Sequence, residues 1–458
     1  MNDTSFFQGK RVTVFGLGLN SGGVGTVKFL AQAGAKEIII TDTKTETELA
    51  SSIAMLRDIP SIRYTLGRHD QQDFVETDLV IKNPGIPWTN EFVQMALIHG
   101  IPVETDASIF FQCCQNQVIG VTGSKGKTTT ALLIVHILEQ ANIPVARIGI
   151  GQVSVLDNLL TLNPDAVVVF ELSSWRLSSM KQSPHISVVT NIYPDHLNYY
   201  ASMEDYVADK ENIFLFQKSE DTLVASGDDD WGSRMIGKAP GRVMRFSGQE
   251  IPEGFFEQEG KMMYQKNSSK EAWFDFSSWH ILGAHNRRNA LAATAALFSF
   301  GLKKEDIVSG LETFPGVPHR LEFVREKDGV KFFNDSAATI PEAAIAALRS
   351  FDQPVILIAG GNDKNLDFSE FAREIPLKTK RCIFFRGAGT EKLLQAMGCQ
   401  DDGTIVRVES MEQAVALAVD GAKSGESILL SPGATSFGLF QNEFDRGNQF
   451  REVVRELK

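Results

Sequence analysis

A glycine-rich loop with two lysines lies between a predicted strand and a predicted helix. The strand QVIGVTG covers residues 117–123, the loop continues as SKGKTTT, and the helical run ALLIVHILEQA covers residues 131–141. Glycines in such a loop let successive backbone N–H groups converge on phosphate oxygens, and the helix N-terminus favours the negative charge. The pattern predicts a nucleotide phosphate site, with an idle connecting loop as the alternative.

Two side chains of this loop suit the phosphates and their metal. Lys127 adds a positive charge near the β and γ phosphates, and the hydroxyl of Thr128 can ligate magnesium. The spacing is one residue shorter than the usual G-x-x-x-x-G-K-[ST] pattern. The strand before the loop and the helix after it nevertheless favour nucleotide binding.

Polar side chains also follow two other apolar strands. Glu171 ends the run DAVVVFE, and His196 comes shortly after HISVVT, in the stretch NIYPDHLNYY. Because ligands bind at the carboxyl ends of parallel strands, we expect both side chains to act as metal ligands beside the phosphate loop. The alternatives are an ion-paired or helix-capping glutamate and an ordinary core or surface histidine.

The N-terminal stretch is typical of a βαβ unit. The strand RVTVFGLG precedes the helical run VGTVKFLAQAGA and the strand EIIITD, which ends at Asp42. Gly16, Gly18 and Gly22 permit a tight turn close to a phosphate. Ser21 stands where a G-x-G-x-x-G motif has its third glycine, so a plain strand-to-helix turn is the alternative. We expect a small parallel sheet that ends near residue 105.

Strands and helices alternate again toward the C-terminus. After GVPHRLE, at residues 316–322, the strand-like runs KFFNDSAAT, PVILIAGGNDK, RCIFFRG and SILLSPGATS are separated by helical stretches. This alternation predicts a second doubly wound sheet, with Gly360-Gly361 and the loop after Leu430 at strand ends where a ligand would bind. We interpret the polar stretch 217–280 as an antiparallel insertion in the middle domain.

Length and charge narrow the class of protein. The 458 residues, 43% hydrophobic and 22% charged, suit a globular chain of roughly three domains. A formal net charge of -12 and a pI near 5.3 argue against nucleic acid or an anionic membrane as a partner. A small anionic substrate stays compatible with this charge, since local basic groups can face it.

The sequence contains no sign of secretion or membrane insertion. Apolar runs stay shorter than about 18 residues and the N-terminus lacks the order of a signal peptide, so we expect a cytoplasmic protein. The four cysteines, Cys113, Cys114, Cys382 and Cys399, form no C-x-x-C pair and no cluster with histidine. We expect buried free thiols, with neither a disulfide nor zinc.

In their order along the chain, these motifs resemble those of the Mur ligases of peptidoglycan synthesis. The matching motifs are TGSKGKTTT, ELSSW, NIYPDHLNYY, GAHNRRN, GVPHRLE, NDSAAT and LLSPGATSFGLFQNEFDRGNQF. The resemblance extends over essentially the whole chain. It implies an α/β fold of three domains: a Rossmann-like UDP-substrate-binding domain at 1–105, a central P-loop ATPase-type domain at 106–316, and a Rossmann-like amino-acid-binding domain at 317–458.

The resemblance also implies an activity. Within the family, the opening FGLGLNSGG, the NPGIP turn and the closing DRGNQF are similar to those of the enzyme that adds glutamate to UDP-N-acetylmuramoyl-L-alanine. The expected reaction is the ATP-dependent addition of D-glutamate through an acyl phosphate. ATP and Mg²⁺ would be the cofactors, small molecules the partners, and a monomer the expected state.

The resemblance assigns roles to individual positions. Expected contacts to ATP are Gly123, Ser124, Lys125, Gly126, Lys127, Thr128, Thr129, Asn286, Arg320 and Asp335. Expected magnesium ligands are Thr128, Glu171, His196 and Lys210, the last as a carbamate, and the expected catalytic residues are Lys127, His196 and Lys210. Lys364 and Ser436 would contact glutamate, and Gly18, Thr43 and Lys44 would lie near the UDP group.

Three positions depart from the family pattern. Ala337 stands where a lysine is usual, Glu443 stands where an aromatic residue is usual, and Ile150 replaces an asparagine. The first two lie around the amino-acid pocket in the family, and the third lies near the muramoyl substrate. Ligation of L-glutamate is therefore the alternative to ligation of D-glutamate.

Two other classes of protein stay open as alternatives. A regulatory nucleotide-binding ATPase would use the phosphate loop but would have no use for His196, Lys210 or Lys364. An NAD-dependent dehydrogenase would rest on the N-terminal glycines and Asp42, and it would leave TGSKGKTTT unexplained.

Overall fold

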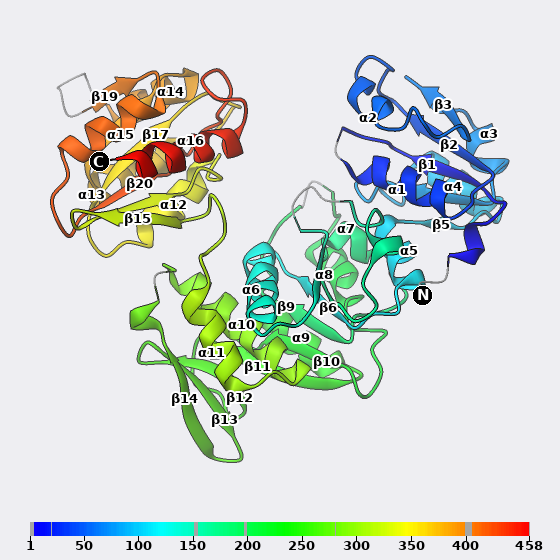
Figure 1. Cartoon of the computed structure of the whole chain (residues 1–458), viewed down its shortest axis with the longest axis horizontal. Helices are drawn as coiled ribbons and strands as arrows, with labels where there is room; N and C mark the ends of the chain where they lie inside the picture. The colour runs from blue at the N-terminus through cyan, green and yellow to red at the C-terminus, as the bar shows by residue number, and fades with distance from the viewer. Residues whose placement is uncertain are drawn as a thin grey trace. The chain divides into compact units, whose positions relative to one another are not determined.

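The structure is a computed structural model, and it describes residues 4–19, 21–150, 154–196, 199–279, 281–398 and 405–457. The chain divides into two compact units, one of residues 1–277 and 288–313, the other of residues 278–287 and 314–458. Within the described residues, the first unit holds sheets of five and nine strands and the second a sheet of six (Figure 1). The expected α/β class is confirmed. The division at residue 105 stays a prediction, because the first two sheets belong to one unit.

The N-terminal sheet is parallel throughout, in the order β3-β2-β1-β4-β5. Its strands are β1 (Arg11–Phe15), β2 (Glu37–Asp42), β3 (Ile62–Leu66), β4 (Leu79–Lys82) and β5 (Val103–Glu104). Its helices are α1 (Ser21–Gln32), α2 (Ala50–Ala54), α3 (Gln72–Val75) and α4 (Glu91–Ile98), preceded by a 3₁₀ turn at Ser5–Phe7. The central strands are almost wholly buried, as expected of a parallel sheet that is covered on both faces.

The middle sheet has the order β14-β13-β12-β11-β10-β9-β6-β8-β7. Its strands are β6 (Val118–Thr122), β7 (Val145–Ile148), β8 (Val167–Glu171), β9 (Ile186–Val189), β10 (Thr222–Ser226), β11 (Arg242–Ser247), β12 (Gly254–Gln258), β13 (Lys261–Lys266) and β14 (Ser269–Asp275). Its helices are α5 (Asp106–Cys113), α6 (Lys127–Gln140), α7 (Ser174–Leu177), α8 (Met203–Glu211), α9 (Asp230–Lys238), α10 (Ala284–Phe300) and α11 (Lys304–Thr313), with 3₁₀ turns at Leu159–Thr161 and Phe276–Ser278.

The expectation of an antiparallel insertion at 217–280 is wrong for its first half. Strands β10, β11 and β12 extend the sheet in parallel register, and only β12, β13 and β14 pair antiparallel. Helix α9 supplies the crossover that two parallel neighbours need between β10 and β11. This helix could not be predicted from apolar runs, because much of α9 is polar and exposed.

The C-terminal sheet has the order β15-β16-β20-β17-β18-β19, with β15 antiparallel and the rest parallel. Its strands are β15 (Glu322–Lys327), β16 (Val330–Asn334), β17 (Val355–Gly360), β18 (Thr379–Phe385), β19 (Ile405–Val408) and β20 (Ser427–Leu430). Its helices are α12 (Pro341–Arg349), α13 (Ser369–Lys378), α14 (Ala388–Met397), α15 (Met411–Asp420) and α16 (Glu443–Glu456). The doubly wound sheet expected here is confirmed.

A polar contact joins the two sheets of the first unit. Trp88 Nε1, in the loop after β4, donates to Ser178 Oγ, just after α7, at 3.0 Å. One cluster of buried apolar side chains also includes residues of both sheets, among them Val14 and Phe170. The loop and helix ends around the middle sheet are thereby tied to the N-terminal sheet.

Three of the cysteines, Cys113, Cys114 and Cys382, are free thiols, and Cys399 lies outside the described residues. Burial raises the pKa of the Cys114 thiol, which keeps it in the weakly reactive protonated form. Within the described part of the chain, no helix has the length and apolar character that crossing a bilayer requires.

A helical glycine allows the close packing of α11 against α6. A Cβ atom at Gly310 would lie 2.6 Å from Ile137 Cγ1 and 3.0 Å from Ile137 Cα. We expect Gly310→Ala to lower the free energy of unfolding by about 1–3 kcal/mol, because the two helices must move apart. The control is Gly237→Ala in α9, where a Cβ would meet nothing within 4 Å. That variant should be neutral or stabilised by about 0.5–1 kcal/mol. Urea unfolding measures both, and equal midpoints would contradict the prediction.

Candidate active site

Three neighbouring strands of the middle sheet carry the candidate residues at their carboxyl ends. The order β9-β6-β8 puts β6 in the centre, followed by the phosphate loop. Strand β8 ends at Glu171, and the segment 190–196 follows β9. The expected convergence of these groups at one sheet edge is therefore present in the fold.

Two glycines shape the phosphate loop. Gly123 has a φ of 143° and Gly126 a φ of 86°, both in the region that favours glycine. A Cβ at Gly126 would lie 2.3 Å from Asn289 Oδ1, so a side chain there is also excluded by space. Helix α6 begins directly afterwards at Lys127. Lys127 Nζ donates to the carbonyl oxygens of Gly123 and Ser124, at 3.0 and 3.1 Å. The ammonium thus lies across the loop, at the N-terminus of a helix.

Thr128 and Glu171 are adjacent. Thr128 Oγ1 donates to Glu171 Oε1 at 3.1 Å, and both side chains are part-buried. A hydroxyl and a carboxylate are the hard oxygen donors that Mg²⁺ prefers, so this pair fits the ion. Among the described residues, no group of three or more His, Cys, Asp and Glu side chains could hold a metal. Magnesium here would therefore need further oxygen ligands from phosphate or water.

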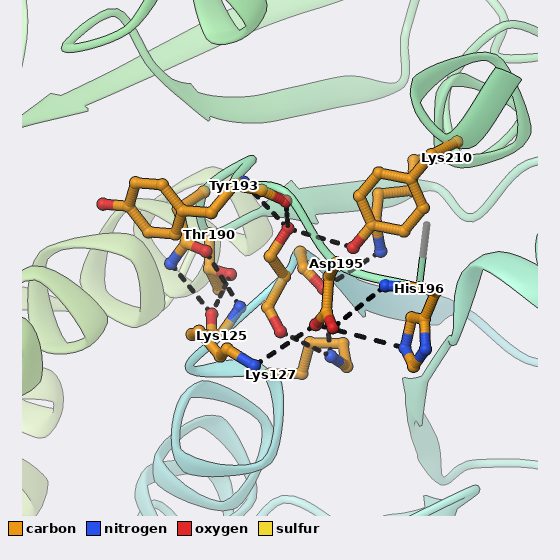
Figure 2. Close-up of polar contacts among 11 residues, drawn as sticks. Lys125, Lys127, Thr190, Tyr193, Asp195, His196 and Lys210 are labelled. Carbon is orange, nitrogen blue, oxygen red and sulfur yellow. Dashed lines mark hydrogen bonds and ion pairs between the residues drawn. The ribbon is translucent and has the colours of Figure 1, made fainter. Parts of the chain in front are cut away.

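His196 lies beside the phosphate loop rather than inside it. The side chain is partly exposed, its backbone has a φ of 54°, and its ring centroid is 4.8 Å from that of Trp175. The preceding Asp195 pairs with Lys125, Oδ2 to Nζ 3.2 Å (Figure 2). Burial raises the pKa of Asp195, but the Lys125 hydrogen bond and charge outweigh it and lower the pKa.

Lys210 on α8 is buried against the phosphate loop, with 1% of its surface exposed. Its Nζ donates to Gly123 O at 3.0 Å and lies 3.4 Å from Thr122 Oγ1 (Figure 2). Nζ also lies 4.7 Å from the centre of the Tyr206 ring. Burial lowers the pKa of Lys210 well below its usual value, and the positive charge of Lys127 lowers it further.

The acidic neighbours of Lys210 in sequence have other partners. Asp209 accepts a hydrogen bond from Tyr200 Oη at 2.9 Å, and burial raises the pKa of Asp209 to about 6. Glu211 pairs with Lys238 at 2.7 Å. These contacts direct both carboxylates to other partners, although the charge of Asp209 still acts to raise the pKa of Lys210 against the larger effect of burial.

The expected UDP-binding residues gather around the carboxylate of Asp42. Its oxygens accept hydrogen bonds from the backbone N–H groups of Gly18 and Lys44, at 3.0 and 2.9 Å. Gly18 has a φ of 67°, and Thr43 is exposed at the same strand end. Asp42 is therefore a structural centre of this region, although the sequence pattern suggested it only for the dehydrogenase alternative.

The expected nucleotide residues outside the phosphate loop differ in exposure. Asp335 is buried after β16, where it accepts from Leu321 N at 3.1 Å and from Ser431 Oγ at 2.8 Å. Burial raises the pKa of Asp335 to about 7. Arg320 is exposed, and its positive charge acts on the carboxyl of Asp335. Asn286 is buried, and its side chain donates to the carbonyl of Leu282 at 2.7 Å.

The two expected amino-acid ligands are not equally placed. Ser436 is buried and lines a small depression of the second unit, together with Gly361 and Arg446. Lys364 is exposed and is not among the lining residues. Of the two departures from the family pattern nearby, Ala337 is half-buried and Glu443 begins α16.

Several residues that contact the site were missed from the sequence. Thr190, Asn191 and Tyr206 all bond to the phosphate loop. The spacing along the chain could have indicated Tyr206. It precedes Lys210 by one helical turn, which places both residues on one face of α8. The two residues after β9 offered a second signal, since polar groups at a strand end can reach a neighbouring loop.

Comparison with known protein families shows which family the chain belongs to. The Mur ligase MurD-like N-terminal domain matches residues 10–105, the Mur ligase middle domain matches 121–297, and the Mur ligase glutamate ligase domain matches 319–433. The chain belongs to the Mur ligase family. The Mur ligase middle domain thus contains the phosphate loop, Glu171, His196 and Lys210.

Curated relatives match over nearly their whole length. The UDP-N-acetylmuramoylalanine--D-glutamate ligase of Roseiflexus sp. (strain RS-1) is 39% identical, covering 98% of this chain and 99% of the relative. The ligase of the same name from Alkaliphilus metalliredigens is 35% identical, covering 98% of each chain.

Solved Mur ligases share the fold. MurF from Acinetobacter baumannii gives a TM-score of 0.60 at 18% identity, covering 100% of this chain and 93% of that one. MurF ligase from Thermotoga maritima, in complex with ADP, gives 0.58 at 15% identity, covering 100% and 97%.

The position of Lys127 generates a test of the phosphate site. We expect Lys127→Ala to lower ATP-dependent ligase activity by roughly 10²–10³-fold, because it removes a cation from the place where phosphate charge is stabilised. The circular dichroism spectrum should not change. Lys218→Ala, at an exposed lysine, is the control and should keep full activity. An activity within about tenfold of the parent, worth about 1.4 kcal/mol, would remove Lys127 from the site.

Proposed function

We propose that this Mur ligase joins D-glutamate to UDP-N-acetylmuramoyl-L-alanine, with conversion of ATP to ADP and phosphate. The observation that carries the proposal is the convergence of Lys127, the Thr128–Glu171 pair and Lys210 at one edge of the middle sheet. The full-length curated relatives bear the name of this reaction. We also expect the enzyme to act as a cytoplasmic monomer on small molecules.

The chain's own residues supply charge and positioning for the first step. A substrate carboxylate attacks the γ-phosphate of ATP, which gives an acyl phosphate and releases ADP. Lys127 and the N-terminus of α6 stabilise the negative charge of the phosphates during this transfer. Mg²⁺ would be held by Thr128 and Glu171, and a second ion by His196 and carbamylated Lys210, and these ions would neutralise phosphate charge.

The second step needs an amino-acid site. The glutamate amine attacks the activated carbonyl, and the tetrahedral intermediate expels phosphate. Lys364 and Ser436 would hold the glutamate, since a lysine and a hydroxyl can bind carboxylates. Asn286, Arg320 and Asp335 would hold the rest of the nucleotide. Gly18, Thr43 and Lys44 would lie near the UDP group. Water must be kept from the acyl phosphate, because its hydrolysis would waste ATP.

The choice of glutamate enantiomer tests the proposed function. With UDP-N-acetylmuramoyl-L-alanine, ATP and Mg²⁺, we expect D-glutamate to give the ligated product and L-glutamate to give little. Ala337 and Glu443 leave L-glutamate as the alternative, because a missing cation and an added anion both change how a dicarboxylate is bound. Mass and chiral analysis of the product decides between them. Phosphate release without any amino acid would instead favour the regulatory ATPase.

We further propose that Lys210 is a carbamate in the active enzyme. Its neutral amine would add to carbon dioxide with loss of one proton, which gives an anionic oxygen ligand suited to Mg²⁺. Two features support this: the lowered pKa of Lys210, and the fact that among the described residues its hydrogen bonds go to a carbonyl and a hydroxyl rather than to a carboxylate. A lowered pKa increases the fraction of the neutral amine, which is the form that reacts with carbon dioxide.

Two variants test the carbamate. Lys210→Ala should be nearly inactive and should regain part of its activity with added small carboxylates. Carbon-13 bicarbonate should give a carbamate signal in the parent that this variant lacks. Lys82→Met is the matched control, because Lys82 is also a buried lysine and burial lowers its pKa to about 8. The control should keep the signal, and full activity of Lys210→Ala would make Lys210 a purely structural residue.

A further inference from the structure

The segment after β9 is bonded along the phosphate loop. Ser124 N donates to Asn191 O at 2.9 Å, and Ser124 Oγ bonds with both the N–H and the carbonyl of Tyr193, each at 2.9 Å. The same segment continues to Asp195 and His196 (Figure 2). The loop that would hold phosphate and the segment that carries His196 are therefore one hydrogen-bonded assembly.

The side chain of Asn191 bonds to the loop in both directions. Its Oδ1 accepts from Lys125 N at 2.9 Å, and its Nδ2 donates to Lys125 O at 2.9 Å. An amide side chain offers one acceptor and two donors, and this orientation uses both kinds on a single residue of the loop. No smaller or apolar side chain could fix both the N–H and the carbonyl of Lys125.

Thr190 makes the second connection. Its Oγ1 donates to the carbonyl oxygen of Lys125 at 2.6 Å and lies within hydrogen-bond distance of that of Thr122, at 3.2 Å, and the residue is 6% exposed. A Cβ at Gly123 would lie 1.9 Å from this hydroxyl. The missing side chain of Gly123 therefore makes room for Thr190 as well as permitting the backbone turn.

The ion pair between the same two segments contributes less. The side chain of Lys125 is 71% exposed, so solvent and salt screen its attraction to Asp195. The hydrogen bonds of Thr190 are buried or part-buried, and those of both Thr190 and Asn191 fix backbone groups of the loop directly. These two residues, rather than the Lys125–Asp195 pair, hold the shape of the loop.

We propose that Thr190 and Asn191 are positioning residues, which hold the phosphate loop in its nucleotide-binding shape before any nucleotide is present. A loop that is already ordered loses less conformational entropy when it binds phosphate, so its affinity is higher. The inference rests on the proposed ATP site. It states that Thr190 and Asn191 raise the affinity for nucleotide although neither touches the reacting atoms.

The test compares ATP binding in Thr190→Val, Thr190→Ser and Asn191→Ala. Thr190→Val keeps the shape of the side chain and removes the hydroxyl, while each affected carbonyl keeps one other hydrogen bond, from Thr190 N or Asn191 Nδ2. Calorimetric titration with MgATP should show a Kd raised about tenfold or more for Thr190→Val and Asn191→Ala. Thr190→Ser should stay within about threefold of the parent, because it restores the donor.

Two further readouts separate positioning from a general loss of structure. The KM for ATP should rise in Thr190→Val and Asn191→Ala, while the KM for glutamate should stay within about threefold of the parent value. Amide exchange of the peptide covering residues 118–130 should be faster without nucleotide, whereas exchange in the C-terminal sheet should not change.

Three outcomes would contradict either this inference or the proposed function. Unchanged ATP affinity in both Thr190→Val and Asn191→Ala would overturn the inference, even if amide exchange in the phosphate loop is faster. Failure of Thr190→Ser to restore affinity would also overturn it, because the hydroxyl would then not be the cause. If the parent protein binds no ATP at all, the proposed function fails instead.

Discussion

The carbonyl oxygen of Gly123 accepts hydrogen bonds from two lysine side chains, Lys127 and Lys210, each at 3.0 Å. Two ammonium groups bound to one oxygen repel each other, and this repulsion is strong where solvent is excluded. The conflict is relieved when Lys210, the more buried of the two, gives up its proton. The loop, α6 and α8 meet at this one carbonyl group, so the fold itself places Lys210 where burial and Lys127 lower its pKa.

Buried ionisable side chains bond to the surrounding loops in both the N-terminal and the C-terminal parts of the chain. Asp42 in the N-terminal part and Asp335 in the C-terminal part both accept from backbone N–H groups. Arg446 is completely buried and donates to a serine hydroxyl and two backbone carbonyls, while burial lowers its pKa to about 10. In all three, neutral groups replace the hydration that burial removes, and the surrounding loops are held in place.

More of the residues that could do chemistry could be predicted from the sequence than of the contacts that hold them in place. The phosphate loop, Glu171 and the second doubly wound sheet follow from apolar runs and from the polar residues that end them. The contacts of Thr190 and Asn191 could not be predicted, because they depend on the distance between two loops that only the assembled sheet brings together. The parallel course of β10 to β12 was hidden by a polar helix. The roles of Lys364 and Ser436 depend on the family resemblance, since an exposed lysine and a serine have no distinctive pattern.

The nine-stranded sheet does not close on itself, and β14 is one of its two outer strands, with β7 at the other end. An uncovered outer strand offers free backbone N–H and carbonyl groups to any other extended chain, which is a common route to aggregation. Here β14 begins with charged, exposed residues: Lys270 pairs with Glu250, and Glu271 pairs with Lys304. A register shift opposite Met262 and Met263 leaves Trp273 of β14 as an extra, unpaired residue, and this irregularity also disturbs the edge. The charged residues and the irregular register at β14 thus disfavour pairing of this edge with the sheet of a second copy of the protein.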